Sequence, residues 1–196
     1  MTAVLRRPWD PRILPIELDV ITAFETYFEG LMPVPKHELL TKFRLKPAGP
    51  ERFEYSSRQI VLPMSDGLGR MRGLQCIDPH GRRDYWPESQ IAGNAFLIDD
   101  FDLKKPIYLC TCYECALTLR KVKKLQAIAV FENWNLEVDA DVYSRFDPAI
   151  NIVGNWRGSR AYELAVKAHR KYDSELLMPP RPYLTMGDFY RMKQSF

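Results

Sequence analysis

The sequence predicts an α/β protein in which an N-terminal helical segment and a small antiparallel β-meander precede a parallel sheet with flanking helices. Two observations predict this class. Residues 53–86 contain short apolar runs separated by turn-forming residues, and the chain after about residue 95 alternates apolar strands with helices. Such alternation favours parallel βαβ units. We expect one compact unit built from an arm with helices (1–52), the meander (53–98) and the α/β domain (99–196).

The composition is that of a globular protein large enough for one sizeable domain. The chain has 196 residues, of which 46% are hydrophobic and 27% charged, and its net charge of +3 permits a nucleic-acid partner without requiring one. No apolar run approaches the roughly 20 residues of a membrane helix, and the N-terminus, with Arg6, Arg7 and Asp10, does not resemble a secretory signal. We therefore expect no membrane association and a cytoplasmic location.

The N-terminal segment begins as a proline-rich arm over residues 1–20 and continues as helices. Between residues 17 and 30, apolar side chains recur at the spacing of one helix face, among them Val20, Phe24 and Phe28, and Gly30 is a typical stop. Two prolines, Pro33 and Pro35, then interrupt the chain. A short helix is predicted after them, at 36–42.

Three strands are expected in the meander, over residues 57–64, 70–77 and 82–86. The two connections between them are rich in Gly, Asp, Ser and Pro, which favour tight turns. His80 lies in the second connection, and we expect it to be a solvated turn residue rather than a ligand.

The α/β segment is expected to supply the functional site. Strands are predicted at 107–110, 125–131, 149–153 and 176–178, and helices at 113–125 and 159–172. In parallel sheets the functional crevice lies at the carboxyl ends of the strands. This rule places Thr111, residues 132–135 and residues 155–157 around one pocket.

The four cysteines have three possible roles. Cys110, Cys112 and Cys115 could hold zinc with Cys76 as the fourth ligand, could form a disulfide, or could be small buried side chains in a reducing compartment. Because Cys110 ends a predicted strand and Cys115 lies a turn into a predicted helix, their side chains need not converge. We favour the buried interpretation and expect no metal.

Short motifs follow one another in a characteristic order along most of the chain. They are HELLTK at 37–42, IVLPM at 60–64, GLQCIDPHG at 73–81, GNAF at 93–96, CTCYECAL at 110–117, VFENWNL at 130–136, GNWR at 154–157 and DF at 188–189. Together they resemble the primase-type Toprim proteins of plasmids, phages and integrative elements. The resemblance implies a Toprim-like parallel sheet and a role in DNA replication.

The same resemblance indicates that the catalytic acids are missing. Such proteins are expected to use a glutamate as general acid or base and a pair of aspartates to hold Mg²⁺; the corresponding positions here hold Thr111, Asn155 and Arg157. Threonine cannot carry the proton, and a guanidinium repels a divalent cation. We expect no catalytic residue, no cofactor and no metal-dependent phosphoryl transfer. Acidic residues at 139, 141 and 147 lie nearby, on what we predict to be a connecting segment.

Two sets of residues could bind an anion in place of a metal. Asn155, Arg157, Arg160 and the predicted helix start near Ser159 could cradle a phosphate, while Trp134, Trp156 and Asn135 could contact a base. The tryptophans could instead fill the emptied metal pocket. A second basic patch contains Arg120, Lys123 and Lys124, which could contact phosphate or form a solvated helix end.

The resulting hypothesis is an inactive Toprim-like protein that binds DNA or RNA in the replication or maintenance of a mobile genetic element. The alternative is a protein–protein interaction module on the same scaffold, acting on a replication partner or on a second copy. A third class, an enzyme built on Cys112, Glu114 and Glu132, lacks a histidine nearby in sequence to activate a nucleophile. The kind of nucleic acid and the oligomeric state stay open.

Overall fold

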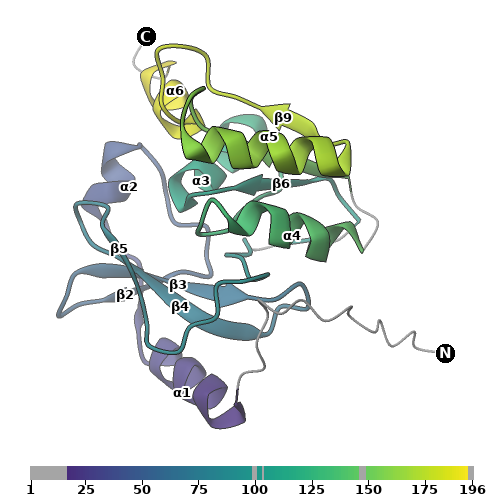
Figure 1. Ribbon diagram of the computed structural model, residues 1–196. Coiled ribbons are helices and arrows are strands. Elements are labelled where there is room, and N and C mark those ends of the chain that lie inside the picture. The colour runs from purple at the N-terminus through teal and green to yellow at the C-terminus, as the bar shows by residue number, and fades with distance from the viewer. Residues whose placement is uncertain (1–16, 99–100, 103, 146–148, 194–196) are drawn as a thin grey trace.

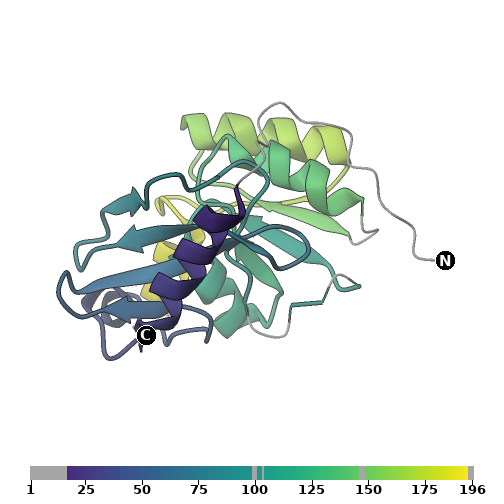
Figure 2. The same ribbon diagram turned by 90° about the horizontal axis from the view of Figure 1, so that it is seen from below.

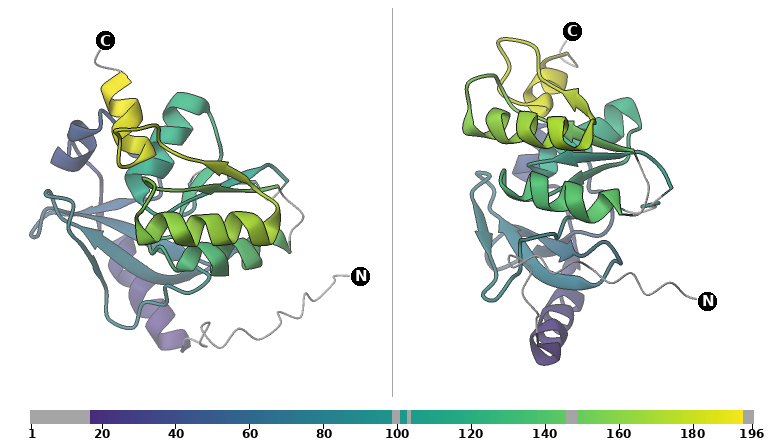
Figure 3. Two further views of the ribbon diagram at one scale, coloured as in Figure 1. Left: turned by 45° about the horizontal axis from the view of Figure 1, so that its top comes forward. Right: turned by 45° about the vertical axis from the view of Figure 1, so that its right-hand side comes forward.

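The computed structural model describes residues 17–98, 101–102, 104–145 and 149–193, so most of the predicted N-terminal arm and Asp147 lie outside the described residues. The described chain forms two sheets stacked one above the other, with α1 at one end and α5 and α6 at the other (Figure 1, Figure 3). One sheet is antiparallel with five strands and the other has four parallel strands.

The N-terminal part forms the two predicted helices. Helix α1 (Leu18–Glu29) buries Phe24 and Phe28 against the antiparallel sheet, across which it lies (Figure 2). Helix α2 (Glu38–Lys42) is capped by His37, whose side chain accepts a hydrogen bond from the backbone N–H of Leu39.

The antiparallel sheet contains the expected meander and two further strands. Its order is β1-β2-β3-β4-β5, with bounds Met32–Pro33, Arg52–Glu54, Gln59–Ser65, Met71–Ile77 and Arg83–Tyr85. Strands β1 and β2 were not predicted as separate elements, because two or three residues are too few to display an alternating pattern. The carboxylate of Asp66 holds the β3–β4 turn by accepting hydrogen bonds from Arg70, Arg72 and the backbone N–H of Leu68.

The parallel sheet has the order β7-β6-β8-β9 (Ala127–Ala129, Ile107–Cys110, Ile150–Val153 and Glu175–Leu177). Helix α3 (Tyr113–Lys123) follows β6 and packs on the face turned toward the antiparallel sheet. Helices α4 (Asn135–Ser144) and α5 (Arg160–Tyr172) pack on the opposite face. Because β7 and β8 lie on either side of β6, the crossovers diverge there, which marks the switch point where ligands bind in open α/β sheets.

Two helices, α4 and α6, were not predicted. Asp139 and Asp141 lie on the segment that connects β7 to β8, as predicted, and this segment forms α4. Most residues of α4 are buried, so the sequence shows no one-sided apolar stripe. The last helix, α6 (Met186–Lys193), packs against α3 near the end of the described chain.

A core common to both sheets joins the two halves. Leu62 of β3, Cys110 of β6 and Leu119 of α3 belong to one buried cluster, and Phe96 pairs with Ala129 beside the parallel sheet. The predicted boundary at 98/99 therefore crosses a shared core, and the division into three segments stays a prediction. In the described part of the chain no helix is long and apolar enough to cross a membrane.

Candidate functional site

The carboxyl ends of three parallel strands open into a cavity of about 470 Å³, which we call the strand-tip cavity. Thr111 follows β6, Glu132 and Asn133 follow β7, and Asn155 follows β8, and all four line the cavity. Gly154, directly before Asn155, lies against the Met178 side chain. A Cβ atom on Gly154 would lie 2.4 Å from the Met178 sulfur, so any other residue would require the Met178 side chain to move.

Segments distant in sequence complete the walls of the strand-tip cavity. Helix α2 contributes Lys42, the antiparallel sheet contributes His80 and Arg83, and α6 contributes Asp188. The cavity thus lies where the parallel sheet, the antiparallel sheet and the C-terminal helix meet. The sequence pattern predicts that the three strand tips lie together. It does not predict that Lys42, Arg83 and Asp188 form the opposite wall of the cavity.

Each carboxylate in the strand-tip cavity has a partner within the fold. Arg83 donates from Nη2 to both carboxylate oxygens of Glu114, at 2.7 Å each. The Tyr85 hydroxyl donates to Glu132 at 2.7 Å, and the Thr185 hydroxyl donates to Asp188 at 2.8 Å. The acidic groups of the cavity are therefore committed to internal hydrogen bonds.

The pKa values of these groups depend on burial and on the charge of the hydrogen-bonding partner. Burial alone would lower the pKa of Arg83, but the nearby Glu114 carboxylate outweighs this and raises it. Burial and the hydrogen bond to Glu132 raise the pKa of Tyr85. Among the described residues, no group of three or more His, Cys, Asp or Glu side chains is arranged to hold a metal ion. Thr111 and Asn155 offer only neutral oxygens, which are weak ligands for Mg²⁺.

The structure also tests the third class, an enzyme built on a cysteine. The strand-tip cavity brings His80 to the same walls as Cys112, Glu114 and Glu132, which the sequence did not indicate. However, a hydrogen bond with Cys115, followed by burial, raises the pKa of Cys112 well above its ordinary value. The thiolate is the nucleophilic form, so the Cys112 thiol is not activated. Glu114 is held by Arg83 and is not available as its base.

The four cysteines do not form one zinc site. All are free thiols, and Cys76 packs beside α1 in a core cluster that is separate from the one containing Cys110 and Cys115. The buried interpretation fits Cys76, Cys110 and Cys115, whereas Cys112 is partly exposed in the strand-tip cavity.

The exposed residues at the same edge of the sheet lie outside the cavity lining. Trp134 is 42% exposed and Trp156 is 46% exposed, so neither tryptophan fills an emptied metal pocket. Arg157 and Arg160 are exposed beyond the end of β8. Ser159 caps α5 by accepting a hydrogen bond from the Tyr162 N–H at 3.0 Å, which already satisfies one of the helix donors expected to cradle a phosphate. We refer to Trp134, Trp156, Arg157 and Arg160 as the exposed edge.

Asn135 does not lie where a nucleic acid could contact it, contrary to the prediction. Its side chain is fully buried at the start of α4. The amide nitrogen donates to the carbonyl oxygens of Ile91, Asn94 and Val130, and the amide oxygen accepts from the Gly93 N–H. Asn135 therefore ties the loop that follows the antiparallel sheet to the parallel sheet.

The second predicted basic patch is remote from the strand tips. Arg120, Lys123 and Lys124 lie at the C-terminal end of α3, whereas Thr111 and Cys112 precede its N-terminal end. An α-helix of 11 residues is about 16 Å long, so the two groups belong to different surfaces. The Lys123 amine lies 5.8 Å from the centre of the Tyr190 ring, while Arg120 and Lys124 line a separate pocket.

Comparison with known proteins identifies the fold. No protein-family model matches the sequence, and no curated protein matches it. The primase fragment of the bacteriophage T7 primase-helicase protein superposes with a TM-score of 0.54 at 12% identity, over 85% of this chain and 80% of that chain. The E. coli primase catalytic core gives 0.50 at 16% identity, over 94% and 70%.

A third similar structure is that of the bacteriophage T7 lagging-strand DNA polymerase interacting with primase domains of two gp4 subunits bound to an RNA/DNA hybrid and dTTP. It gives a TM-score of 0.55 at 11% identity, over 74% of this chain and 76% of that chain. The chain therefore has the Toprim-type α/β fold of primase catalytic cores, which confirms the predicted fold class.

Proposed function

We propose that this protein is a Toprim-type module that binds nucleic acid at its exposed edge without metal-dependent phosphoryl transfer, in the replication or maintenance of a mobile genetic element. The observation that carries the proposal is the chemistry of the strand-tip cavity. The positions that would hold catalytic acids carry Thr111 and Asn155, and the carboxylates that remain are bound to Arg83, Tyr85 and Thr185.

Divalent-metal chemistry is disfavoured here by charge as well as by ligand type. Mg²⁺ needs one or two carboxylates in addition to waters and phosphates. Releasing Glu114 for such a role would leave the partly buried Arg83 guanidinium unpaired, which is costly. Arg157, beyond the β8 tip, adds a further positive charge near the site.

The exposed edge has the residue types that bind single-stranded nucleic acid. Arginine contacts phosphate through paired N–H donors, and exposed indoles offer faces on which bases can stack. Trp134 and Trp156 lie in the segments that follow β7 and β8, the strands on either side of β6.

The similar solved structures support a context of replication. One of them contains primase domains bound to an RNA/DNA hybrid and dTTP. The alternative function is a protein–protein interaction module on the same scaffold that acts on a replication partner. Exposed tryptophans and arginines are also typical of protein interfaces, so this alternative makes use of the same edge.

The test is fluorescence anisotropy of fluorescein-labelled single- and double-stranded DNA and RNA, titrated with protein at low and moderate salt, with and without Mg²⁺. The proposal expects salt-sensitive binding that is tighter for single strands and does not require Mg²⁺. Each phosphate contact contributes about 0.7 to the slope of log affinity against log salt for a single strand. The Arg157→Ala/Arg160→Ala variant loses two such contacts. Its binding should therefore depend less on salt, and the magnitude of the slope should decrease by about 1.4.

The matched control is Arg170→Ala, which removes an exposed arginine from the same helix, ten residues and about 15 Å beyond Arg160. This control should bind as the wild-type protein does. The Trp134→Ala/Trp156→Ala variant should bind single strands roughly tenfold more weakly or worse. Absence of binding at low salt would contradict the proposal and favour the protein-interaction alternative. Equal losses of affinity in the Arg157→Ala/Arg160→Ala variant and the Arg170→Ala control would also contradict the proposal.

A further inference from the structure

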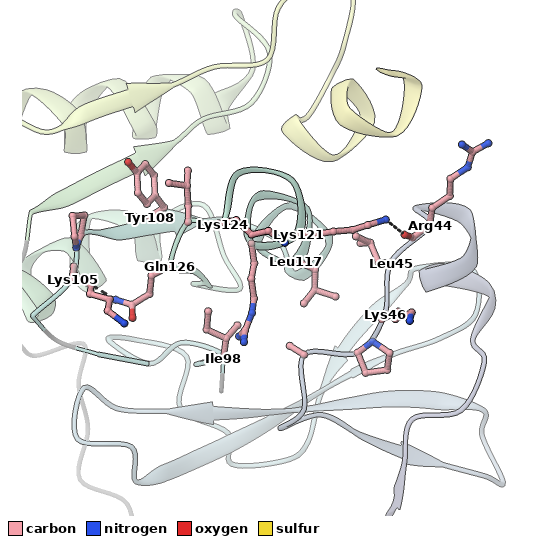
Figure 4. A pocket seen from close by; sticks show the side chains of 15 residues that line it. Arg44, Leu45, Lys46, Ile98, Lys105, Tyr108, Leu117, Lys121, Lys124 and Gln126 are labelled. Carbon is pink, nitrogen blue, oxygen red and sulfur yellow. Dashed lines mark hydrogen bonds between the residues drawn. The ribbon is translucent and has the colours of Figure 1, made fainter. Parts of the chain in front are cut away.

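Helix α3 carries different side chains at its two ends. Its C-terminal end lines a pocket of about 810 Å³ with residues such as Leu117 and Lys124, and no cysteine belongs to the described lining of this pocket (Figure 4). Its N-terminal end brings Cys112 and Cys115 to the wall of the strand-tip cavity, and we call these two residues the thiol pair. The proposed binding of nucleic acid at the exposed edge makes no use of them.

The thiol pair occupies the first turn of α3. Cys112 is the N-cap residue, with an extended backbone, and Cys115 is the third residue of the helix. Side chains at these two positions lie over the same turn, which is why they can bond reciprocally in a capping box. Helix geometry places Cα atoms three residues apart at about 5 Å, and a disulfide spans Cα distances of about 4.4–6.8 Å. The spacing of the thiol pair therefore suits a disulfide.

The two thiols of the pair interact with each other rather than with the helix. Cys112 does not use its side chain to cap α3. A hydrogen bond with Cys115 is instead the main influence on the Cys112 thiol, so the two sulfur atoms are neighbours. Cys110 is fully buried, directs its thiol to the Tyr108 carbonyl oxygen at 3.8 Å and does not line the cavity. Cys76 lies in a different core cluster.

The two thiols of the pair differ in access. Cys112 is partly exposed in the strand-tip cavity, whereas Cys115 is only 2% exposed. Helix α6 covers the Cys115 sulfur, which would lie 3.7 Å from a Cβ atom on Gly187. A reagent in the cavity therefore meets Cys112 first, and Cys115 reacts with a group already attached to Cys112. An accessible thiol beside a resolving thiol is typical of cysteines that undergo reversible oxidation.

The ionisation of Cys112 sets the rate of such a reaction. The hydrogen bond with Cys115 and burial raise the pKa of Cys112, and the nearby Arg83 guanidinium opposes them only in part. Few Cys112 thiols are ionised at neutral pH, so exchange is slow there and faster at higher pH. The thiolate that does form is more nucleophilic than that of a low-pKa cysteine, which offsets part of this loss.

We propose that Cys112 and Cys115 are a reversible oxidation site, which forms a disulfide across the first turn of α3 when a low-molecular-weight disulfide such as glutathione disulfide enters the strand-tip cavity. The proposal does not depend on nucleic-acid binding, because it involves no residue of the exposed edge.

The reaction is two successive thiol–disulfide exchanges. The Cys112 thiol loses its proton to solvent, and its sulfur attacks the S–S bond of the reagent. One half of the reagent stays on Cys112, and the other half leaves and takes up a proton. The deprotonated Cys115 sulfur then attacks the Cys112 sulfur, and the second half leaves in the same way. Two protein S–H bonds are replaced by one S–S bond, and the two electrons reduce the reagent to two thiols.

The test incubates the reduced protein with glutathione disulfide at about pH 8.5, near the pKa of an ordinary cysteine. The reaction is stopped with acid, the remaining thiols are alkylated with iodoacetamide, and intact protein and chymotryptic peptides are analysed by mass spectrometry. Cleavage after Tyr113 separates Cys112 from Cys115. We expect the wild-type protein to lose two hydrogen atoms and two alkylation sites, to retain no glutathione, and to show a link between peptides 110–113 and 114–117. Dithiothreitol should reverse the change.

Three variants separate the two steps. Cys115→Ser should stop at the mixed disulfide, with one glutathione on Cys112, because no second thiol resolves it. Cys112→Ser should react roughly tenfold more slowly or not at all, because Cys115 is buried. The matched control is Cys76→Ser, which removes a cysteine outside the cavity and should oxidise as the wild-type protein does.

The wild-type experiment decides the proposal even if a variant fails to fold. Three results would overturn it: no reaction with the wild-type protein, glutathione retained on Cys112 without an internal disulfide, or a link from Cys112 to Cys110 as frequent as the link to Cys115. The same incubation in urea removes the geometry of α3. Equal selectivity in urea and in the folded protein would also overturn the proposal, because the fold would then not select the pair.

Discussion

The cavities at the two ends of α3 differ in how deeply their charged side chains are buried. The strand-tip cavity contains acids and bases, but each of its carboxylates is bound to a partner such as Arg83 or Tyr85. The pocket at the C-terminal end of α3, of about 810 Å³, is lined by exposed lysines such as Lys46 and Lys124. Lys105, at its edge, lies 3.8 Å from Asp102. Removing one member of a buried ion pair leaves the other charge uncompensated, whereas substituting an exposed lysine changes stability little. Substitutions in the first region should therefore lower stability, and those in the second should not.

The largest effect is expected at Asn135, behind the strand-tip cavity. Asn135→Ala would remove four buried hydrogen bonds, among them the one that the Gly93 N–H donates. The carbonyl oxygens of Ile91 and Val130 would keep only the backbone N–H groups of Asn94 and Glu132 as donors. We expect a loss of about 3 kcal/mol in the free energy of unfolding, measured by urea denaturation. The partly buried neighbour Asn133 is the control, and Asn133→Ala should cost less than about 0.5 kcal/mol. Similar losses in the two variants would contradict the role of Asn135 as a tie between the sheets.

A smaller loss is expected when the ion pair of the strand-tip cavity is broken. The Glu114 side chain is 6% exposed, so Arg83→Met should cost about 2 kcal/mol by leaving its carboxylate buried and unpaired. Adding Glu114→Gln to Arg83→Met should recover part of this loss, which a double-mutant cycle in urea denaturation would detect. Simple additivity of the two substitutions would show that the pair does not stabilise the fold.

Substitution of Asp139 should raise rather than lower stability, because this buried acid has no ionic partner among the described residues. Burial raises its pKa well above the ordinary value, and the Asn135 side chain offsets this only in part. The folded state thus binds the proton more tightly than the unfolded state, so the wild-type protein loses stability as pH rises above about 4. Asp139→Asn should raise the free energy of unfolding at pH 7 by about 1–2 kcal/mol.

This advantage of Asp139→Asn should shrink as the pH falls toward about 4, where the unfolded-state carboxyl is also protonated. Thermal unfolding at several pH values would measure it. A destabilised variant at pH 7, or a difference that does not change with pH, would contradict the account of Asp139.

The smallest effect is expected in the pocket at the C-terminal end of α3. Lys46→Met/Lys124→Met removes two exposed charges whose neighbours in the lining are also cations. The free energy of unfolding should change by less than about 0.5 kcal/mol, and any change should be favourable at low salt because repulsion is relieved. A loss above about 1 kcal/mol in urea denaturation would show that these lysines stabilise the fold and would weaken the contrast between the two cavities.

Much of the fold could be predicted because local patterns decide it. The strand at 107–110 and the helix that follows it were predicted from an apolar run with polar residues after it, and the structure has both. Helix α4 was missed because burial on nearly all sides removes the helical stripe. Strands β1 and β2 are too short to show a pattern.

The candidate site was predictable only on one side. The convergence of Thr111 and Asn155 follows from the rule that the ends of parallel strands meet at one edge. The opposing side depends on pairs such as Arg83–Glu114 and Tyr85–Glu132, whose members are 31 and 47 residues apart and share no local signal. Asn135 illustrates the same limit, because its position beside Trp134 in sequence does not reveal that one side chain is buried and the other exposed.

The central claim is that the strand-tip cavity does not hold a divalent cation. The most direct measurement is electron paramagnetic resonance of free Mn²⁺, a substitute for Mg²⁺, titrated with the wild-type protein and with the Thr111→Glu/Asn155→Asp/Arg157→Asp variant. We predict that the wild-type protein leaves the free Mn²⁺ signal unchanged and that the variant, with three carboxylates restored, lowers it. A saturable decrease caused by the wild-type protein and abolished by Glu132→Gln would show that the cavity binds the metal and would contradict the account.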